Sequence, residues 1–299
     1  MKLAKEKAFP VIMNALKEDV GSGDITTSVV FEKDVNITAE IVAKEECVIA
    51  GIDVARWIFD ALDERIIFRP LCKDGDGVRK GKRVISLKGS VRSILAGERT
   101  VLNFIGRLSG VSTLTSRFVD RARKGNARIF DTRKTTPGLR VLEKYAVVIG
   151  GGCNHRMGLW DEILIKDNHL DALRVSSRGL RSNAVRDGVR TAKARGYKNI
   201  EIEVNNLKEY SEALDAEPDI IMLDNMKIED IKKAVRLRRS RSSRKSRTAS
   251  SELRPALEVS GGVNLGNVAR ISKTGIDRIS IGSLTHSAPS VDFSLGICK

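Results

Sequence analysis

The chain has 299 residues, of which 41% are apolar and 4% aromatic. That length exceeds what one small core needs and suits one large α/β domain or two domains. No window approaches the roughly 18 unbroken apolar residues that a membrane helix requires. The charged start lacks the apolar run of a signal peptide, and the four scattered cysteines form no C-x-x-C pair. We therefore expect a cytoplasmic protein without disulfides, zinc or a membrane contact.

The formal net charge of +15 is concentrated in two segments. Residues 172–196 and 236–254 carry net charges of +6 and +7, so the rest of the chain is close to neutral. The second segment is rich in Ser and Arg and predicts an exposed, mobile insertion. A solvated insertion is the preferred interpretation, and binding of a polyanion is the alternative. Nucleic acid is not an expected partner.

The first 112 residues predict an α+β domain. Their apolar spacing indicates helices over 4–19, 51–62 and 93–112, and alternation indicates a strand over 34–44. The run Asp74-Gly75-Asp76-Gly77 is a strong turn signal and predicts a hairpin between short strands.

From residue 113 onward the pattern changes to strand and helix in alternation, which builds a parallel sheet. The absence of a dinucleotide fingerprint favours a closed or nearly closed barrel. We therefore expect an N-terminal domain over 1–112, which the chain's end could rejoin, and a barrel domain over 113–299 with a basic insertion at about 236–254. The expected strands are 127–131, 162–166, 200–204, 220–224, 256–260 and 278–282, with helices that include 137–149 and 182–195.

Chemistry in a parallel barrel is found where the strands end. The early strand ends carry cations, which suit carboxylate groups of a substrate, and the middle ends carry carboxylates, which suit Mg²⁺ or ribose hydroxyls. The late ends are glycine-rich turns, which suit a phosphate. The candidate cations are Arg133, Lys134, Arg156 and Lys166, and the candidate carboxylates are Glu203 and Asp224. The candidate phosphate-binding turns contain Ser260, Gly261 and Gly282.

Each candidate also has a plainer interpretation. Arg133 and Lys134 could form a solvated strand end, and a lone His155 is more often structural. Glu201 and Glu203 share one face of their strand, so one could face the barrel interior or both could form ion pairs outside it. A Ser-Gly-Gly turn often only links a strand to a helix.

Several runs resemble one family in the order in which they occur. The most specific are DTRKTTPGLR (131–140), GGCNHR (151–156) and IKDNH (165–169), joined by GERTVLN (97–103), LDN (223–225), EVSGG (258–262) and IGSLTHS (281–287). They resemble the quinolinate phosphoribosyltransferase family nearly end to end.

That resemblance implies an N-terminal α/β open-faced sandwich and a C-terminal incomplete TIM-like α/β barrel. It implies transfer of a phosphoribosyl group from phosphoribosyl pyrophosphate to quinolinate with decarboxylation, giving nicotinate mononucleotide for NAD biosynthesis, with Mg²⁺ as cofactor. It also implies a homodimer or higher assembly. A related phosphoribosyltransferase for nicotinate or another ring acid is the alternative enzyme, and a polyanion-binding role of the basic insertion is the alternative of another class.

The resemblance also implies roles for individual residues. Arg99 would enter the partner's site. The expected ligands of the quinolinate carboxylates are Arg133, His155, Arg156 and Lys166. Lys134 would approach the phosphoribosyl donor, and Glu203 and Asp224 would serve the ribose and Mg²⁺, directly or through water. Ser260, Gly261 and Gly282 would bind the 5′-phosphate, and the candidate catalytic residues are Lys134, Lys166, Glu203 and Asp224.

Overall fold

The computed structural model describes residues 3–176, 183–245 and 255–298. Its contacts divide the chain into two compact units. Unit 1 comprises Met1–Arg117, Lys134–Gly152 and Gly282–Lys299, and unit 2 comprises Phe118–Arg133 and Cys153–Ile281. The expected boundary after residue 112 falls inside one helix, α4 (Val91–Ala122), and stays a prediction.

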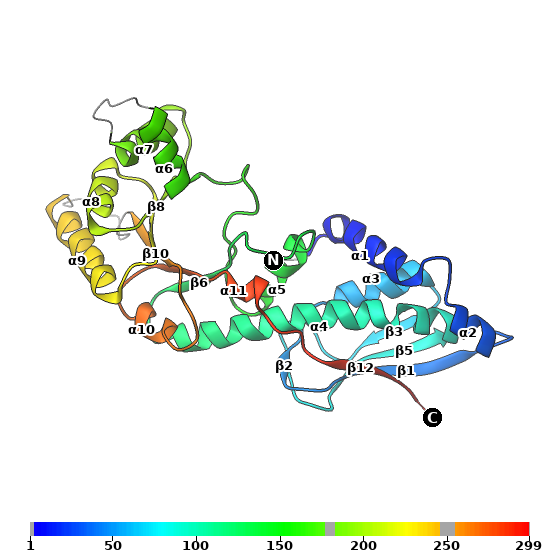
Figure 1. The fold of residues 1–299 in the computed structure, drawn as a ribbon. Helices are drawn as coiled ribbons and strands as arrows, with labels where there is room; N and C mark the ends of the chain where they lie inside the picture. Colours follow the sequence, from blue (N-terminus) through cyan, green and yellow to red (C-terminus); the bar gives the residue numbers. More distant parts are fainter. Residues whose placement is uncertain (1–2, 177–182, 246–254, 299) are drawn as a thin grey trace. The chain divides into compact units, whose positions relative to one another are not determined.

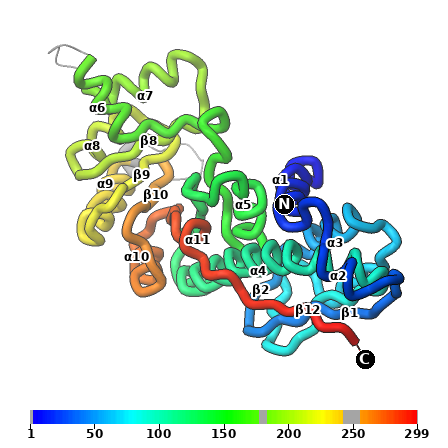
Figure 2. The backbone as a smooth tube through the Cα atoms, turned by 45° about the vertical axis from the view of Figure 1, so that its right-hand side comes forward, coloured from blue at the N-terminus to red at the C-terminus, as the bar shows by residue number. Residues whose placement is uncertain are grey.

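Unit 1 contains a four-stranded antiparallel sheet in the order β12-β1-β5-β3. Its last strand comes from the end of the chain and pairs Ala39 with Ile297 (Figure 2). Alternate residues such as Ile41 and Leu87 are buried, as expected of a sheet with one covered face. The strands are β1 (Asn36–Ala43), β3 (Ile67–Pro70), β5 (Arg83–Ser90) and β12 (Phe293–Ile297), and a separate pair is formed by β2 (Cys47–Val48) and β4 (Gly77–Val78).

Helices cover one side of this sheet (Figure 1). Helix α3 buries Ile58 and Phe59, and α4 buries Ile94, Val101 and Ile105, so their apolar stripes face the sheet side. This arrangement is an open-faced α/β sandwich. The helices of unit 1 are α1 (Lys5–Val20), α2 (Ile25–Val30), α3 (Ile52–Leu62), α5 (Arg140–Ile149) and α11 (Ser283–His286), together with α4 up to Arg117.

The predicted hairpin at residues 74–77 is wrong. Strand β3 pairs with β5, and β4 pairs with β2, so the turn does not join two paired strands. The Asp74 carboxylate instead accepts hydrogen bonds from the backbone N–H groups of Gly51 and Ile52, at 2.9 and 3.0 Å, and from the Tyr145 hydroxyl. A side chain that caps the start of α3 therefore shapes this turn.

Unit 2 contains a six-stranded parallel sheet in the order β6-β11-β10-β9-β8-β7. The order places the first two strands, β6 and β7, at opposite edges, so the sheet is open between them within the described ranges. The predicted fold class, a sandwich followed by an incomplete parallel barrel, is confirmed. The strands are β6 (Arg128–Phe130), β7 (Leu164–Ile165), β8 (Glu201–Val204), β9 (Ile220–Asp224), β10 (Ala256–Ser260) and β11 (Arg278–Ser280).

Helices connect the consecutive strands of unit 2 from β7 to β11 (Figure 1). Most of them bury a short apolar stripe, such as Val185 and Val189 in α7 or Tyr210 and Leu214 in α8, whereas α6 buries Leu170 alone. The connections are α6 (Asp167–Ser176), α7 (Ala184–Ala194), α8 (Leu207–Ala216), α9 (Ile228–Lys245) and α10 (Val268–Ser272). None of the helices in the described residues is long and apolar enough to cross a membrane.

The expected mobile insertion at 236–254 is wrong in its first part, because α9 continues through Lys245. Arg238 is only 2% exposed and anchors this part of the helix. Its guanidinium donates to the carbonyls of Pro255 (3.2 Å) and Gly275 (2.9 Å) and forms an ion pair with Asp277. Residues 246–254, like 177–182 of the other basic segment, lie outside the described residues.

The contacts of Arg238 predict a large loss of stability when the side chain is removed. Arg238→Ala would leave the Asp277 carboxylate without its cation and two carbonyls without a donor, and would remove a large buried side chain, so the free energy of unfolding should fall by about 3 kcal/mol. Arg236→Ala, an exposed position on the same helix, is the matched control and should change it by less than about 0.5 kcal/mol. Urea unfolding of both variants measures the difference, and equal losses would contradict the anchoring role.

Candidate active site

The candidate residues of unit 2 lie along the carboxyl edge of its parallel sheet. Lys166 directly follows β7, Glu203 is the third residue of β8, and Asp224 and Ser260 end β9 and β10. The strand register pairs Ser260 with Asp224. Because all six strands run in the same direction, their polar ends meet at one edge, where α/β proteins bind ligands.

Lys166 and Glu203 form an ion pair at this edge. The Lys166 Nζ lies 3.0 Å from the Glu203 Oε2, and the two side chains are 40% and 7% exposed. Lys166 is also held through its backbone N–H, which donates to the His169 Nδ1 at 2.9 Å. The pair therefore presents a partly exposed ammonium group on a buried carboxylate.

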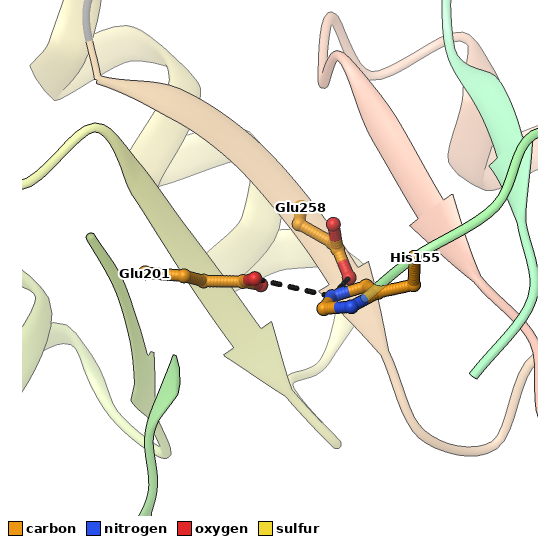
Figure 3. A group of neighbouring side chains, drawn as sticks. All are labelled: His155, Glu201 and Glu258. Carbon is orange, nitrogen blue, oxygen red and sulfur yellow. Dashed lines mark ion pairs between the residues drawn. The ribbon is translucent and has the colours of Figure 1, made fainter. Parts of the chain in front are cut away.

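His155 lies in the interior of unit 2, beside two carboxylates (Figure 3). Its Nε2 is 3.1 Å from Glu201 on β8 and 3.5 Å from Glu258 on β10. The His155 backbone N–H donates to the buried Asp131 at 2.8 Å, and the Arg156 backbone N–H points at the His155 Nδ1 at 2.8 Å. The ring thus bridges two strands, and Asp131 holds the backbone that leads into Arg156.

The charges of His155, Glu201 and Glu258 shift one another's pKa values. Burial disfavours the charged imidazole, but the hydrogen bonds and charges of Glu201 and Glu258 outweigh it and raise the pKa of His155 to about 9. Burial and the neighbouring Glu258 raise the pKa of Glu201. Burial also works to raise the pKa of Glu258, but the hydrogen bond from His155 and the charge of Arg278 hold it below its usual range.

The same three side chains could in principle hold a metal ion, because their ligand atoms lie within 4.8 Å of one another. The chemistry argues against it. Glu258 already accepts a hydrogen bond from the Ser280 hydroxyl and forms an ion pair with the Arg278 guanidinium, whose Nε lies 2.6 Å from the Glu258 Oε2. A guanidinium in this position competes with a cation, and Arg278 is itself held by stacking over the Phe130 ring at 4.0 Å. We interpret the cluster as a buried ion-pair network.

Arg156 is buried and lies near a second cation. Its Nη1 donates to the Glu162 carbonyl at 3.1 Å. Burial and then the positive charge of Arg133 lower the pKa of Arg156. The positive charges of Arg133 and Arg156 repel each other, and an anionic ligand bound between them would offset that repulsion.

Asp224, Ser260 and Gly261 come together at the ends of β9 and β10. The Asn225 backbone N–H donates to the Ser260 carbonyl (2.9 Å), and the Asn225 side-chain amide donates to Asp224 (2.7 Å). Gly261 has φ +82°, and a Cβ there would lie 2.3 Å from the Asn225 Oδ1. Only glycine fits this turn, because the Asn225 side chain packs directly against the Gly261 backbone.

In unit 1, Lys134 and Gly282 are neighbours. A Cβ on Gly282 would lie 3.0 Å from the Lys134 Cδ, so the lysine side chain runs over the glycine. The Thr285 hydroxyl donates to the Lys134 carbonyl at 2.7 Å and so fixes the two segments together. Arg99, also in unit 1, is exposed on α4.

Sequence reasoning missed Glu258 and Arg278, and it left Glu201 undecided. A signal for the first two was present, because each is a charged residue inside a short strand whose other residues are mostly buried. Such a charge needs a buried partner of opposite sign. The open question about β8 is also answered: Glu201 and Glu203 are both buried, and each pairs with a different cation.

Together these features describe an α/β enzyme that acts on anionic small molecules. The chain matches the family description "Quinolinate phosphoribosyl transferase, N-terminal domain" over residues 24–109 and the corresponding C-terminal domain over 111–296. The protein therefore belongs to the quinolinate phosphoribosyltransferase family. The predicted family and the predicted enzyme class, a phosphoribosyltransferase, are confirmed.

Individual relatives agree over nearly their full length. The probable nicotinate-nucleotide pyrophosphorylase [carboxylating] of Methanocaldococcus jannaschii is 40% identical over 303 residues, which cover 99% of each chain. The nicotinate-nucleotide pyrophosphorylase [carboxylating] of Mycobacterium leprae is 38% identical over 298 residues, which cover 98% of each. The solved nicotinate-nucleotide pyrophosphorylase of Francisella tularensis superposes with a TM-score of 0.86 at 38% identity, covering 99% of this chain and 98% of that one.

The raised pKa of His155 predicts a pH-dependent stability. The ring binds its proton more tightly in the folded state, so its contribution is fully present below about pH 6.5 and is lost as the pH rises through about 9. Over that window the free energy of unfolding should fall by roughly 3 kcal/mol more in the wild type than in His155→Gln. Urea unfolding at intervals between these pH values measures it, and parallel curves for the two proteins would count against the charged ring.

Proposed function

We propose that this protein transfers the phosphoribosyl group of phosphoribosyl pyrophosphate to quinolinate with decarboxylation. The products are nicotinate mononucleotide, carbon dioxide and pyrophosphate, and the reaction serves NAD biosynthesis. The observation that carries the proposal is the carboxyl edge of the parallel sheet in unit 2, where the Lys166 ammonium group lies 3.0 Å from the Glu203 carboxylate and Asp224 ends a nearby strand, in a chain that belongs to this family.

Quinolinate carries two adjacent carboxylates, and the cations of unit 2 fit them. Arg133 and Arg156 can each bind a carboxylate through two N–H groups, and Lys166 supplies a point charge. Fixing the dianion in this way removes part of its repulsion from the phosphates of the donor and orients the ring nitrogen toward the anomeric carbon. His155 is enclosed by Glu201 and Glu258, which favours a role behind Arg156 over direct binding.

The chemical steps follow from the charges. The bond from the anomeric carbon to pyrophosphate breaks, positive charge develops on the sugar, and Glu203 or Asp224 stabilises it. The ring nitrogen then bonds to that carbon and becomes cationic. The adjacent carboxylate leaves as carbon dioxide, its electron pair stays on the ring carbon beside the cationic nitrogen, and that carbon takes up a proton. On the donor side, Lys134 and the turns at Gly261 and Gly282 are proposed to bind phosphate oxygens.

The carboxylates at the edge fit a Mg²⁺ ion to different degrees. Asp224 is half-buried and accepts from a neutral amide, so its negative charge is available to a cation. Glu203 is paired with Lys166 and would act through water. Mg²⁺ commonly binds one or two carboxylates, several waters and substrate phosphates. When bound, it would neutralise charge on the leaving pyrophosphate.

Asp224→Asn should lower the affinity of the enzyme for Mg²⁺ while preserving the fold. Because the amide has no charge, the Mg²⁺ concentration for half-maximal activity should rise about fivefold to tenfold. A titration of activity against Mg²⁺ measures it, and removal of the metal with a chelator should abolish turnover. Asp230→Asn, which alters the ion pair with Lys233 on α9, is the matched control and should leave the titration unchanged.

We further propose a homodimer or a higher assembly in which Arg99 completes the partner's site. Its exposure on α4 supports this arrangement. Mixing Arg99→Ala subunits with Lys166→Ala subunits should recover up to about a quarter of wild-type activity, since one site in each mixed dimer keeps both residues. Activity of refolded mixtures measures the recovery, and its absence from dimers shown to be mixed would contradict the shared site.

The proposed location is the cytoplasm. Cys47, Cys72, Cys153 and Cys298 are all free thiols, as expected in a reducing compartment. Burial raises the pKa of Cys47 to about 12 and that of Cys72 to about 11, so these two thiols resist ionisation and oxidation.

The direct test is product formation from quinolinate, phosphoribosyl pyrophosphate and Mg²⁺, with carbon dioxide and nicotinate mononucleotide followed together. Both products should appear at equal rates with quinolinate and neither with nicotinate as substrate. Turnover of nicotinate alone would instead support the related enzyme, and no turnover of either by folded protein would refute the proposal.

A further inference from the structure

Arg107, on α4, joins three segments of unit 1 that are distant in sequence. Its Nε and Nη2 lie 3.0 and 2.7 Å from the Glu143 Oε1 on α5. Its Nη1 donates to the Ala288 carbonyl at 2.7 Å, and its Nη2 also donates to the Thr285 carbonyl in α11. Both views show α5 and α11 beside α4 (Figures 1 and 2). One guanidinium therefore binds both α5 and the segment 285–288.

Glu143 carries the connection to the segment that follows Lys134. Its side chain is fully buried. Its Oε2 accepts the Thr136 backbone N–H at 3.0 Å, and its Oε1 accepts the Thr136 hydroxyl at 2.7 Å. The carboxylate thus binds the backbone two residues beyond Lys134 on one side and Arg107 on the other.

Thr285 in α11 completes the set of contacts, because it bonds to both Arg107 and the Lys134 backbone. Thr285, whose carbonyl accepts from Arg107, donates its hydroxyl to the Lys134 carbonyl at 2.7 Å. The Lys134 side chain passes so close to Gly282 that a Cβ there would be 3.0 Å from the Lys134 Cδ. Lys134 and the Gly282 turn are therefore held at a fixed separation by one arginine, acting through Glu143 and Thr285.

The chemistry of the arginine matters here. A planar guanidinium can donate in several fixed directions at once, which a lysine ammonium on a flexible chain cannot reproduce. Arg107 is 20% exposed and Glu143 is not exposed, so the pair interacts where water screens charge weakly. The contacts of Arg107 therefore depend on both its charge and the fork geometry of its guanidinium.

We propose that Arg107, with Glu143, is a positioning residue for the phosphoribosyl half of the active site. The inference rests on the proposed function only in taking Lys134 and the Gly282 turn as the groups that bind the donor's phosphates. Arg107 sets the distance between them without touching the substrate. Loss of the fork lets the two segments separate and weakens donor binding, while quinolinate binding, assigned to unit 2, changes little.

The test is Arg107→Lys in the full chain, which keeps the charge and removes the fork. The KM and Kd for the Mg²⁺ complex of phosphoribosyl pyrophosphate should rise about tenfold, while those for quinolinate stay within about twofold. Steady-state kinetics and calorimetry give the two sets of values. Arg92→Lys is the matched control, because Arg92 lies on the same helix and donates to the Phe31 carbonyl (2.6 Å). It should leave both substrates unaffected.

A second variant covers the case in which Arg107→Lys does not fold. Thr285→Val keeps the shape of a buried side chain and removes the hydroxyl that binds the Lys134 carbonyl. It should raise the donor's KM in the same direction by about threefold to fivefold, as expected for loss of one neutral hydrogen bond. An unchanged donor KM in this variant overturns the inference.

The outcomes separate the inference from the proposed function. A purely structural role of Arg107 would lower kcat in proportion to the folded fraction and leave both KM values unchanged, and that result overturns the inference. If the wild type binds the donor but does not turn over quinolinate, the proposed function fails, and a weaker donor affinity in Arg107→Lys still supports the positioning role. A wild-type chain that does not bind the donor overturns both.

Discussion

The structure of unit 2 depends on how it buries charge. Glu201 and Glu258 lie inside a sheet of apolar strands, where an unpaired carboxylate would be very costly. His155 and Arg278 offset that cost, and each reaches in from a different segment. Since neither cation can leave without exposing a carboxylate to an apolar interior, the strands β8, β10 and β11 and the segment 153–156 are fixed relative to one another.

That constraint explains why the candidate binding groups can lie at strand ends and still be rigid. Asp131 accepts a hydrogen bond from the backbone N–H of His155, and the ring of His155 pairs with Glu201 and Glu258. Arg156, whose guanidinium is proposed to bind quinolinate, is therefore one residue from a buried network. Preorganisation of this kind lets a cation act on a bound anion without first rearranging. It also gives a physical reason for the enclosed position of a histidine that the sequence suggested as a ligand.

The sequence was most informative where a local pattern determines structure. Alternating strands and helices predicted all six parallel strands, and the run from Asp131 to Arg140 indicated the family. It was least informative where a side chain distant in sequence determines the local backbone conformation. The turn at 74–77 depends on hydrogen bonds from Asp74 to Gly51 and Ile52, and the basic stretch after residue 236 stays helical because Arg238 reaches Asp277. Neither partner can be read from spacing alone.

Arg107 and His155 illustrate one principle in two chemically different forms. Each is a cation that does not need to meet the substrate, and each is set against a fully or nearly fully buried glutamate. Arg107 is tied through Glu143 to the backbone two residues beyond Lys134, and the backbone N–H of His155, which directly precedes Arg156, donates to Asp131. Arg107 uses the directional fork of a guanidinium, which depends on geometry and is insensitive to pH. His155 uses a ring whose charge can change, so the part of unit 2 that it holds is tied to protonation. The two devices should therefore fail differently: one through altered geometry at any pH, the other through loss of a proton in the alkaline range.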